Sequence, residues 1–264
     1  MADDIILETM KLRREFGALV AVANVSIQVR ANTLHSIIGP NGAGKTTLFN
    51  LVSGTISPTS GRVMFKGRDI TNIPLYRTAH LGIGRSFQIT NIFPNLTVME
   101  NVRLACQALG RDNFKFLSHH RRFRHYEERA WEVLRQVGLA ERALQLARNL
   151  PHGDKRKLEL GMILAPDPEV LMLDEPTAGM AAEQVPELIA LIQEIRSAGN
   201  KTVILVEHNM NVVMGASDRI TVMHQGQVLA EGTPAEISAN EVVQSAYLGG
   251  LYGDLADGRR PKAQ

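Results

Sequence analysis

The sequence has a single cysteine, Cys106, among 264 residues, which excludes a disulfide within the chain and is typical of a reducing compartment. It also lacks any apolar run near the roughly 18 residues that a transmembrane helix requires. The first four residues include two aspartates, and no secretory apolar segment follows them. We therefore expect a cytoplasmic protein whose contact with a membrane goes through a partner protein.

The sequence also has little excess charge of either sign. Its formal net charge of +2 is too small to indicate nucleic acid as the main partner. The most basic segment, 119–125, is compatible with contact to nucleic acid or anionic lipid, but a solvated surface is the simpler interpretation. Its histidines have no nearby cysteine or second ligand cluster, so they do not predict a metal site. Hydrophobic residues make up 44% of the chain, enough for a sizeable core.

The most informative segment that is present is 39–47, which matches the phosphate-loop pattern G-x-x-x-x-G-K-[ST] in full. Small residues let such a backbone curl until its N–H groups surround a polyphosphate, while Lys45 reaches the β- and γ-phosphates and Thr46 offers its hydroxyl to Mg²⁺. An apolar strand is predicted at 34–38 and a helix at 45–52, whose N-terminus favours an anion. We expect a nucleoside triphosphate to bind here, against Gly39, Pro40, Asn41, Gly42, Ala43, Gly44, Lys45, Thr46 and Thr47.

The remaining pattern predicts an α/β fold. Strands are expected from about residue 5 to 35, and hairpins turn at Lys66-Gly67 and Gln225-Gly226. Helical patterns then occupy 98–109, 126–137 and 153–164. Apolar strands return at 170–173 and 203–206, with an amphipathic helix from Val185 between them. We expect a phosphate-loop NTPase core with a mixed sheet, an N-terminal antiparallel β region and an inserted all-helical subdomain.

These patterns define the expected domain organisation. One domain spans 1–250, in which 1–89 and 166–250 form the nucleotide-binding core and 90–165 forms the helical subdomain. Residues 251–264 form a polar, basic tail. Asp174 and Glu175 follow the apolar strand at 170–173, where one carboxylate can associate with Mg²⁺ and the other can accept a proton from water.

Taken in order, the motifs resemble those of the ATP-binding subunits of ATP-binding-cassette (ABC) transporters over nearly the whole chain. After the phosphate loop come Gln88, a signature-like segment at 150–154, the Asp174-Glu175 pair and Glu207-His208. The resemblance implies that Gln88 contacts Mg²⁺ or the attacking water, and that His208 donates to the γ-phosphate. It also implies that Asp174 associates with Mg²⁺ and Glu175 is the catalytic base.

The resemblance extends to the nucleotide's surroundings, with one departure. Phe16 matches the position where the family stacks adenine, and Gly153 permits close backbone approach. The family usually has Leu-Ser-Gly-Gly-Gln where this chain has Leu150-Pro151-His152-Gly153-Asp154. Pro151 supplies neither the hydroxyl nor the N–H that normally bind ATP held by the opposite subunit. We expect a weakened signature face on this subunit.

Within the family, the chain resembles the ATPase subunits of high-affinity branched-chain amino-acid importers. The resemblance rests on stretches at 93–102, 158–162, 176–180, 206–210 and 246–249. It implies ATP and Mg²⁺ as cofactors, and a location at the inner face of the plasma membrane. The implied partners are transmembrane permease subunits, a second ATPase subunit in a homo- or heterodimer and, indirectly, a periplasmic solute-binding protein. Ile92, Phe93 and Leu96 are candidates for a groove that receives a permease helix, or for core residues.

Other functions remain open at this point. ATPases of urea or amide import and of lipopolysaccharide export share much of the pattern, and Pro151 is compatible with a partly degenerate partner that binds ATP without turnover. A soluble cassette ATPase acting on DNA would need a long coiled-coil insertion, and those acting on ribosomes usually carry two cassettes. A small-molecule kinase would lack the ordered Gln88, signature and His208 motifs.

Overall fold

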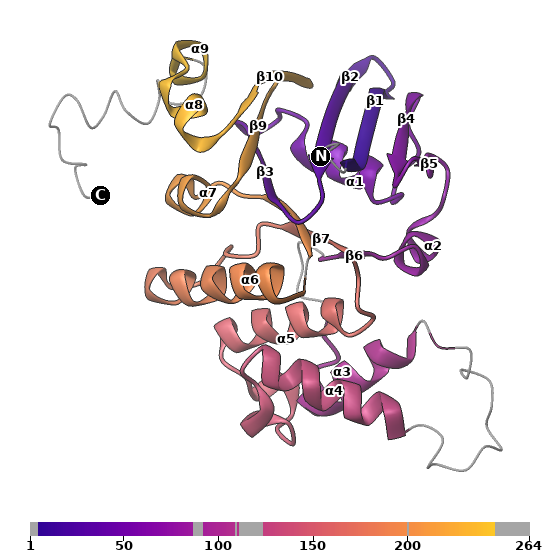
Figure 1. The fold of residues 1–264 in the computed structure, drawn as a ribbon, viewed down its shortest axis with the longest axis vertical. Coiled ribbons are helices and arrows are strands. Elements are labelled where there is room, and N and C mark those ends of the chain that lie inside the picture. The colour runs from indigo at the N-terminus through magenta and orange to yellow at the C-terminus, as the bar shows by residue number, and fades with distance from the viewer. Residues whose placement is uncertain (1–4, 87–91, 109, 111–123, 200, 246–264) are drawn as a thin grey trace, which may run out of the picture.

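The computed structural model describes residues 5–86, 92–108, 110, 124–199 and 201–245, which fold around two β-sheets (Figure 1). The larger sheet has six strands in the order β10-β9-β3-β8-β7-β6. All neighbours in it are parallel except the β9–β10 hairpin. Its strands are β3 (Leu34–Ile38), β6 (Ile83–Arg85), β7 (Val170–Asp174), β8 (Thr202–Val206), β9 (Arg219–His224) and β10 (Gln227–Gly232).

The central strands β3, β7 and β8 are buried along their whole length, as expected for parallel strands covered on both faces. Because side chains alternate along a strand, Leu171 and Leu173 enter one core with the helical part of the molecule. Val170 and Met172 enter a second core on the opposite face, with α1 (Lys45–Val52) and the smaller sheet. The larger sheet therefore lies between two hydrophobic layers.

The smaller sheet has four antiparallel strands in the order β2-β1-β4-β5. The strands are β1 (Ile5–Phe16), β2 (Leu19–Arg30), β4 (Ser60–Phe65) and β5 (Arg68–Asp69). In β2, Val25, Ile27 and Val29 are buried and alternate with exposed residues, which gives a half-buried strand. This sheet packs beside α1 and carries the N-terminal end of the described chain (Figure 1).

Helices cover the other side of the molecule. α3 (Val98–Ala108), α4 (Arg124–Gln136) and α5 (His152–Leu164) form a layer at one end, and α6 (Val185–Gly199) lies between this layer and the large sheet (Figure 1). The remaining helices are α2 (Leu75–His80), α7 (Met210–Ala216), α8 (Pro234–Ala239) and α9 (Glu241–Val243). Short 3₁₀ turns occupy Ala140–Arg142, Ala147–Asn149 and Ala182–Gln184. In the described ranges, no helix combines the length and apolar character needed to cross a membrane.

Most of the predicted elements are confirmed. The mixed sheet, the antiparallel β region and the helices after residue 90 are present, and the helix at 45–52 has the predicted bounds. Both predicted hairpins turn at the expected pairs, where Lys66 and Gln225 adopt positive φ before a glycine. Helices α2, α7, α8 and α9 and the three-residue strand β6 were not predicted. The expected tail at 251–264 lies outside the described residues.

Candidate functional site

The phosphate loop leaves the end of β3 and enters α1, and its glycines are required by the backbone. Gly39 has φ +154°, and a Cβ there would lie 2.3 Å from the Met223 carbonyl oxygen. Gly44 has φ +97°, and a Cβ there would lie 2.4 Å from the Ala21 carbonyl oxygen. Both positions combine a left-handed conformation with close approach of another backbone segment, so only glycine fits without displacement.

Lys45 begins α1 and is buried, with 6% of its surface exposed. Its Nζ donates to the carbonyl oxygens of Gly39 at 2.7 Å and Pro40 at 3.1 Å, so the ammonium lies inside the curve of the loop. Burial lowers the pKa of Lys45, while the nearby carboxylates of Glu175 and Asp174 raise it. The loop therefore holds a cation at its centre, as binding of a polyphosphate requires.

The turn of the β9–β10 hairpin is hydrogen-bonded to the phosphate loop. The Gly226 N–H donates to the Ala43 carbonyl at 3.0 Å, and the Gly226 carbonyl accepts from the Ala23 N–H at 2.7 Å. Gly226 thus joins the phosphate loop to β2. Sequence analysis located this turn but not its role, because the contact depends on β9 pairing with β3. The predicted hairpin at Gln225-Gly226 was the only available signal.

An open cavity of about 560 Å³ lies over the loop. Its walls combine the loop with two catalytic candidates from other elements, Glu175 and His208. Leu19, Val20 and Ala21 from the start of β2 also line it. The lining of this cavity also includes Asn41, Gly42, Ala43, Gly44, Lys45, Thr46, Thr47 and Gln225.

Phe16 is not among the residues that line this cavity. It ends β1, has 46% of its surface exposed, and the Arg14 guanidinium carbon lies 4.6 Å from its ring centre. Leu19, which is paired with Phe16 across the β1–β2 turn, lines the cavity and is 65% exposed. Apolar residues at the start of β2 therefore line the cavity in place of Phe16, and they were not identified from the sequence.

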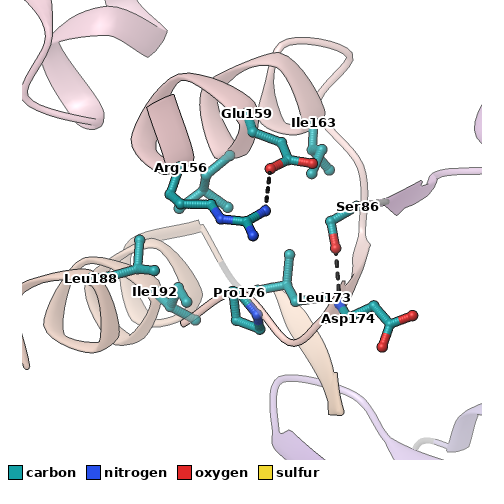
Figure 2. A pocket seen from close by; sticks show the side chains of 10 residues that line it. Ser86, Arg156, Glu159, Ile163, Leu173, Asp174, Pro176, Leu188 and Ile192 are labelled. Atoms are coloured by element: carbon teal, nitrogen blue, oxygen red, sulfur yellow. Dashed lines mark hydrogen bonds and ion pairs between the residues drawn. The ribbon is translucent and has the colours of Figure 1, made fainter. Parts of the chain in front are cut away.

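Asp174 is the last residue of β7, directly before Glu175. It is 3% exposed and is not among the residues that line the phosphate-loop cavity. Its backbone N–H donates to the Ser86 hydroxyl at 2.8 Å, and Figure 2 shows the carboxylate pointing away from the buried Arg156–Glu159 pair. Burial raises the pKa of Asp174, and the Arg85 guanidinium opposes this increase. Among the described residues, Asp174 Oδ1 has no hydrogen-bond partner.

Glu175 and His208 come from the ends of neighbouring parallel strands, β7 and β8. Glu175 has φ +48°, an uncommon conformation for a side chain of this size, and its N–H donates to the Val206 carbonyl at 2.8 Å. The turn places Glu175 Oε1 2.5 Å from His208 Nε2. The structure thus brings together two of the predicted catalytic residues, at the edge of the cavity that contains Lys45.

Three predicted positions lie away from the phosphate-loop cavity or outside the described residues. Gln88 and most of the basic segment 119–125 lie outside the described residues. Gly153 lies in the first turn of α5, and a Cβ there would lie 3.0 Å from Gln184 Oε1. Gly153 is buried and is not part of the lining of the phosphate-loop cavity.

The signature-like segment has its extra carboxylate neutralised. Asp154 Oδ2 lies 3.0 Å from Arg142 Nη1, and Asp154 Oδ1 lies 3.9 Å from Lys157 Nζ. Pro151 is the N-cap residue of α5 and makes no side-chain cap hydrogen bond. The acidic side chain is therefore directed to basic neighbours, which reduces its repulsion of an anion at the helix start.

Known proteins resemble this chain over most of its length. Residues 22–178 match the family model described as ABC transporter, and residues 227–251 match one described as branched-chain amino acid ATP-binding cassette transporter. The chain is 43% identical over 249 residues to the high-affinity branched-chain amino acid transport ATP-binding protein LivG of Salmonella typhimurium. This alignment covers 92% of this chain and 98% of LivG.

Solved structures have the same fold. The ADP conformation of an ATP-binding cassette of an ABC transporter aligns with a TM-score of 0.79 and 28% identity, over 93% of this chain and 99% of that one. A dimeric cassette in a post-hydrolysis state, bound to ADP and Pi, aligns with a TM-score of 0.74 and 26% identity, over 87% and 99% of the two chains. The chain therefore belongs to the ABC transporter family, as one of its ATP-binding cassettes.

Proposed function

We propose that this chain hydrolyses ATP to energise an ABC importer of branched-chain amino acids. The observation that carries the proposal is the 2.5 Å contact between Glu175 and His208 at the edge of the cavity over the phosphate loop. A carboxylate and an imidazole in contact beside a buried ammonium form a set of groups suited to phosphoryl transfer to water.

Each group has a proposed role in that reaction. Glu175 accepts a proton from the water that attacks the γ-phosphorus. Lys45 and the N–H groups of the loop offset the phosphate charge, and His208 donates to the γ-phosphate as negative charge develops there. Gln88 is proposed to contact the water or Mg²⁺, and Phe16, beside Leu19, to stack on adenine.

The chain's oxygen groups are suited to Mg²⁺. Asp174 Oδ1 is buried and accepts no hydrogen bond from the described residues, and Thr46, whose side chain carries a hydroxyl, lines the same cavity as Lys45. Carboxylate and hydroxyl oxygens are ligands that Mg²⁺ accepts, so Thr46 and Asp174 are proposed to hold it, the latter directly or through water. When bound, Mg²⁺ neutralises charge on the β- and γ-phosphate oxygens.

The function also requires partners. A groove of about 570 Å³, mostly apolar, lies between α2, β6, α3 and α5, and its lining includes Ile92 and the half-exposed Phe93. An apolar groove of this kind suits a short helix of a permease subunit.

We propose that 90–165 is a helical subdomain that contacts the permease, while 1–89 and 166–250 form the nucleotide-binding core. The protein would then act at the inner face of the membrane.

A second ATPase subunit is proposed to complete the site. Pro151 and His152 at the start of α5 are exposed and lie outside the lining of the phosphate-loop cavity, as expected if this helix start approaches ATP held by the opposite subunit. Gly153 follows them and is buried. The dimeric cassette bound to ADP and Pi is a precedent for such an arrangement. Branched-chain amino acids are the proposed solute because the similar protein LivG is named as a branched-chain amino acid transport protein. A periplasmic solute-binding protein is proposed to deliver the solute to the permease.

The test is ATP-driven uptake by the assembled transporter. The chain is reconstituted in vesicles with its permeases and solute-binding protein, and labelled leucine uptake is measured with wild type and Glu175→Gln. A general base contributes about 10²–10⁴-fold, so the variant is expected to bind ATP but lose at least about 100-fold in ATPase rate and in uptake. Wild-type turnover by Glu175→Gln would contradict the assignment of the base. ATPase activity without leucine uptake would contradict the assignment of the solute.

A further inference from the structure

Glu207, the residue between β8 and His208, is a buried carboxylate that joins two loops. Only 3% of its surface is exposed. Its Oε1 accepts from the Thr177 N–H at 3.1 Å and from the Thr177 hydroxyl at 2.5 Å. Its Oε2 accepts from the N–H groups of His208 at 3.0 Å and Asn209 at 3.4 Å. One oxygen thus binds the loop that follows Glu175, and the other binds the loop that carries His208.

The topology explains why one side chain can make both sets of contacts. β7 and β8 are parallel neighbours, with Asp174 in register with Val206, so their following loops start side by side. Glu175 leaves this register at once through its positive φ. A group between the loops can therefore set where Glu175 and His208 meet, and Glu207 occupies this place.

A purely structural role does not account for a carboxylate here. Burial of an ionised carboxylate is costly unless its lone pairs are satisfied, and an apolar side chain of similar size fills a core position without that cost. Both oxygens of Glu207 instead accept hydrogen bonds from backbone and hydroxyl donors in two separate loops. The bond from the Thr177 hydroxyl is short, at 2.5 Å, and hydrogen bonds to a carboxylate are directional, which suits a group that fixes geometry.

We infer that Glu207 is a positioning residue for ATP hydrolysis, which holds the Glu175 and His208 loops at the spacing the reaction needs. This inference rests on the proposed function, since it assumes that Glu175 and His208 act on the γ-phosphate. Glu207 itself does not touch the nucleotide cavity. Its removal should therefore lower kcat and leave the KM for ATP close to wild type.

The first test is Glu207→Ala, assayed for ATP hydrolysis in the assembled transporter. A misplacement of about 1 Å can cost on the order of 100-fold in rate, so we expect kcat to fall by about 10- to 100-fold. A second variant, Thr177→Val, removes one donor and should lower kcat by a smaller factor. Thr177→Ser keeps the hydroxyl and should restore the wild-type rate. These Thr177 variants test the inference even if Glu207→Ala does not fold.

Thr9→Val is the matched control. Thr9 is also buried, and its hydroxyl links β1 to β2: it donates to the Val25 carbonyl at 3.1 Å and accepts from the Ile27 N–H at 3.0 Å. It lies in the smaller sheet, away from the proposed catalytic loops. Its loss should leave kcat unchanged. A fall in kcat equal to that of Thr177→Val would contradict a specific role for Glu207 and Thr177.

A double-mutant cycle with His208→Ala separates positioning from stability. If Glu207 acts through the Glu175–His208 contact, Glu207→Ala should have little further effect on kcat once His208 is removed. Multiplied effects of the two substitutions would overturn the inference. The proposed function fails separately, because a wild-type rate for His208→Ala would contradict the catalytic assignment itself.

Discussion

At the scale of single residues, His35 shows how the sheet beneath the phosphate loop constrains a titratable group. It lies fully buried in β3, with Nε2 2.7 Å from the Thr221 hydroxyl. Burial lowers the pKa of His35 to about 4, against the raising effect of Glu231. In the described structure Nδ1 of His35 has no hydrogen-bond partner, so the folded protein strongly favours the neutral ring.

This environment predicts a loss of stability in mild acid. The unfolded chain binds a proton at His35 near pH 6.5, whereas the folded chain does so only near pH 4, so folding free energy is lost as the pH falls through this interval. The shift corresponds to about 3 kcal/mol. His35→Gln retains a partner for Thr221 without titrating. Urea unfolding of both proteins from pH 7 to pH 4 should therefore show the steeper decline in wild type, and parallel curves would contradict the prediction.

Several individual residues could be read from the sequence because their role is local. The glycines at 39, 42 and 44 and Lys45 belong to one contiguous loop, so their spacing alone predicts the cradle that the structure contains. Glu207 and Gly226 act across the sheet, through strands far apart in the sequence. Their contacts depend on strand order and register, which no local pattern specifies.

At the scale of elements, α5 differs from the family pattern at its start. Pro151 caps the helix without a side-chain hydrogen bond, and the Asp154 carboxylate is directed to Arg142. The helix still forms because proline is tolerated at this end and an acidic residue suits the first turn. The helix is therefore intact. What we propose to be weakened is the binding of its first residues to ATP held by the opposite subunit.

Pro151→Ser tests this interpretation of α5. Serine restores a hydroxyl and a backbone N–H, and its side chain can also cap the helix, which typically stabilises by about 1 kcal/mol. We expect a higher ATPase rate in the assembled transporter and stronger ATP-dependent association. Pro151→Ala, which restores only the N–H, serves as control. Equal rates for wild type and both variants would contradict a limiting role for Pro151.

Elements with a clear apolar pattern were predicted, whereas several of the shortest helices and strands were not. The buried strands and the helices of 11 to 15 residues carried clear apolar patterns. α7 has seven residues, and β6 has three, too few for a period to be recognised. The N-cap of α7, where the Asn209 side chain accepts from the N–H groups of Asn211 and Val212, was not predicted either.

At the scale of the whole molecule, the large sheet gathers residues that lie far apart along the chain. Lys45 lies at the start of α1, after the loop that leaves β3, while Glu175 and His208 follow β7 and β8. These three strands are adjacent and parallel in the sheet, so all three residues reach one cavity. The sequence predicted the acidic pair Asp174-Glu175 at the phosphate site from its place after an apolar strand, whereas His208 was assigned to the site only through the family resemblance. The remaining groups, on the start of α5, are proposed to be supplied by a second subunit.

The central claim is that two such subunits enclose ATP and separate after Glu175-dependent hydrolysis. The most direct measurement is the molar mass of purified Glu175→Gln in solution, by light scattering, with Mg·ATP and with Mg·ADP, beside wild type. We expect Glu175→Gln to form a stable dimer with Mg·ATP and not with Mg·ADP, and wild type to return to monomer as ATP is consumed. A variant that stays monomeric with Mg·ATP, even when the permeases are supplied, would contradict it.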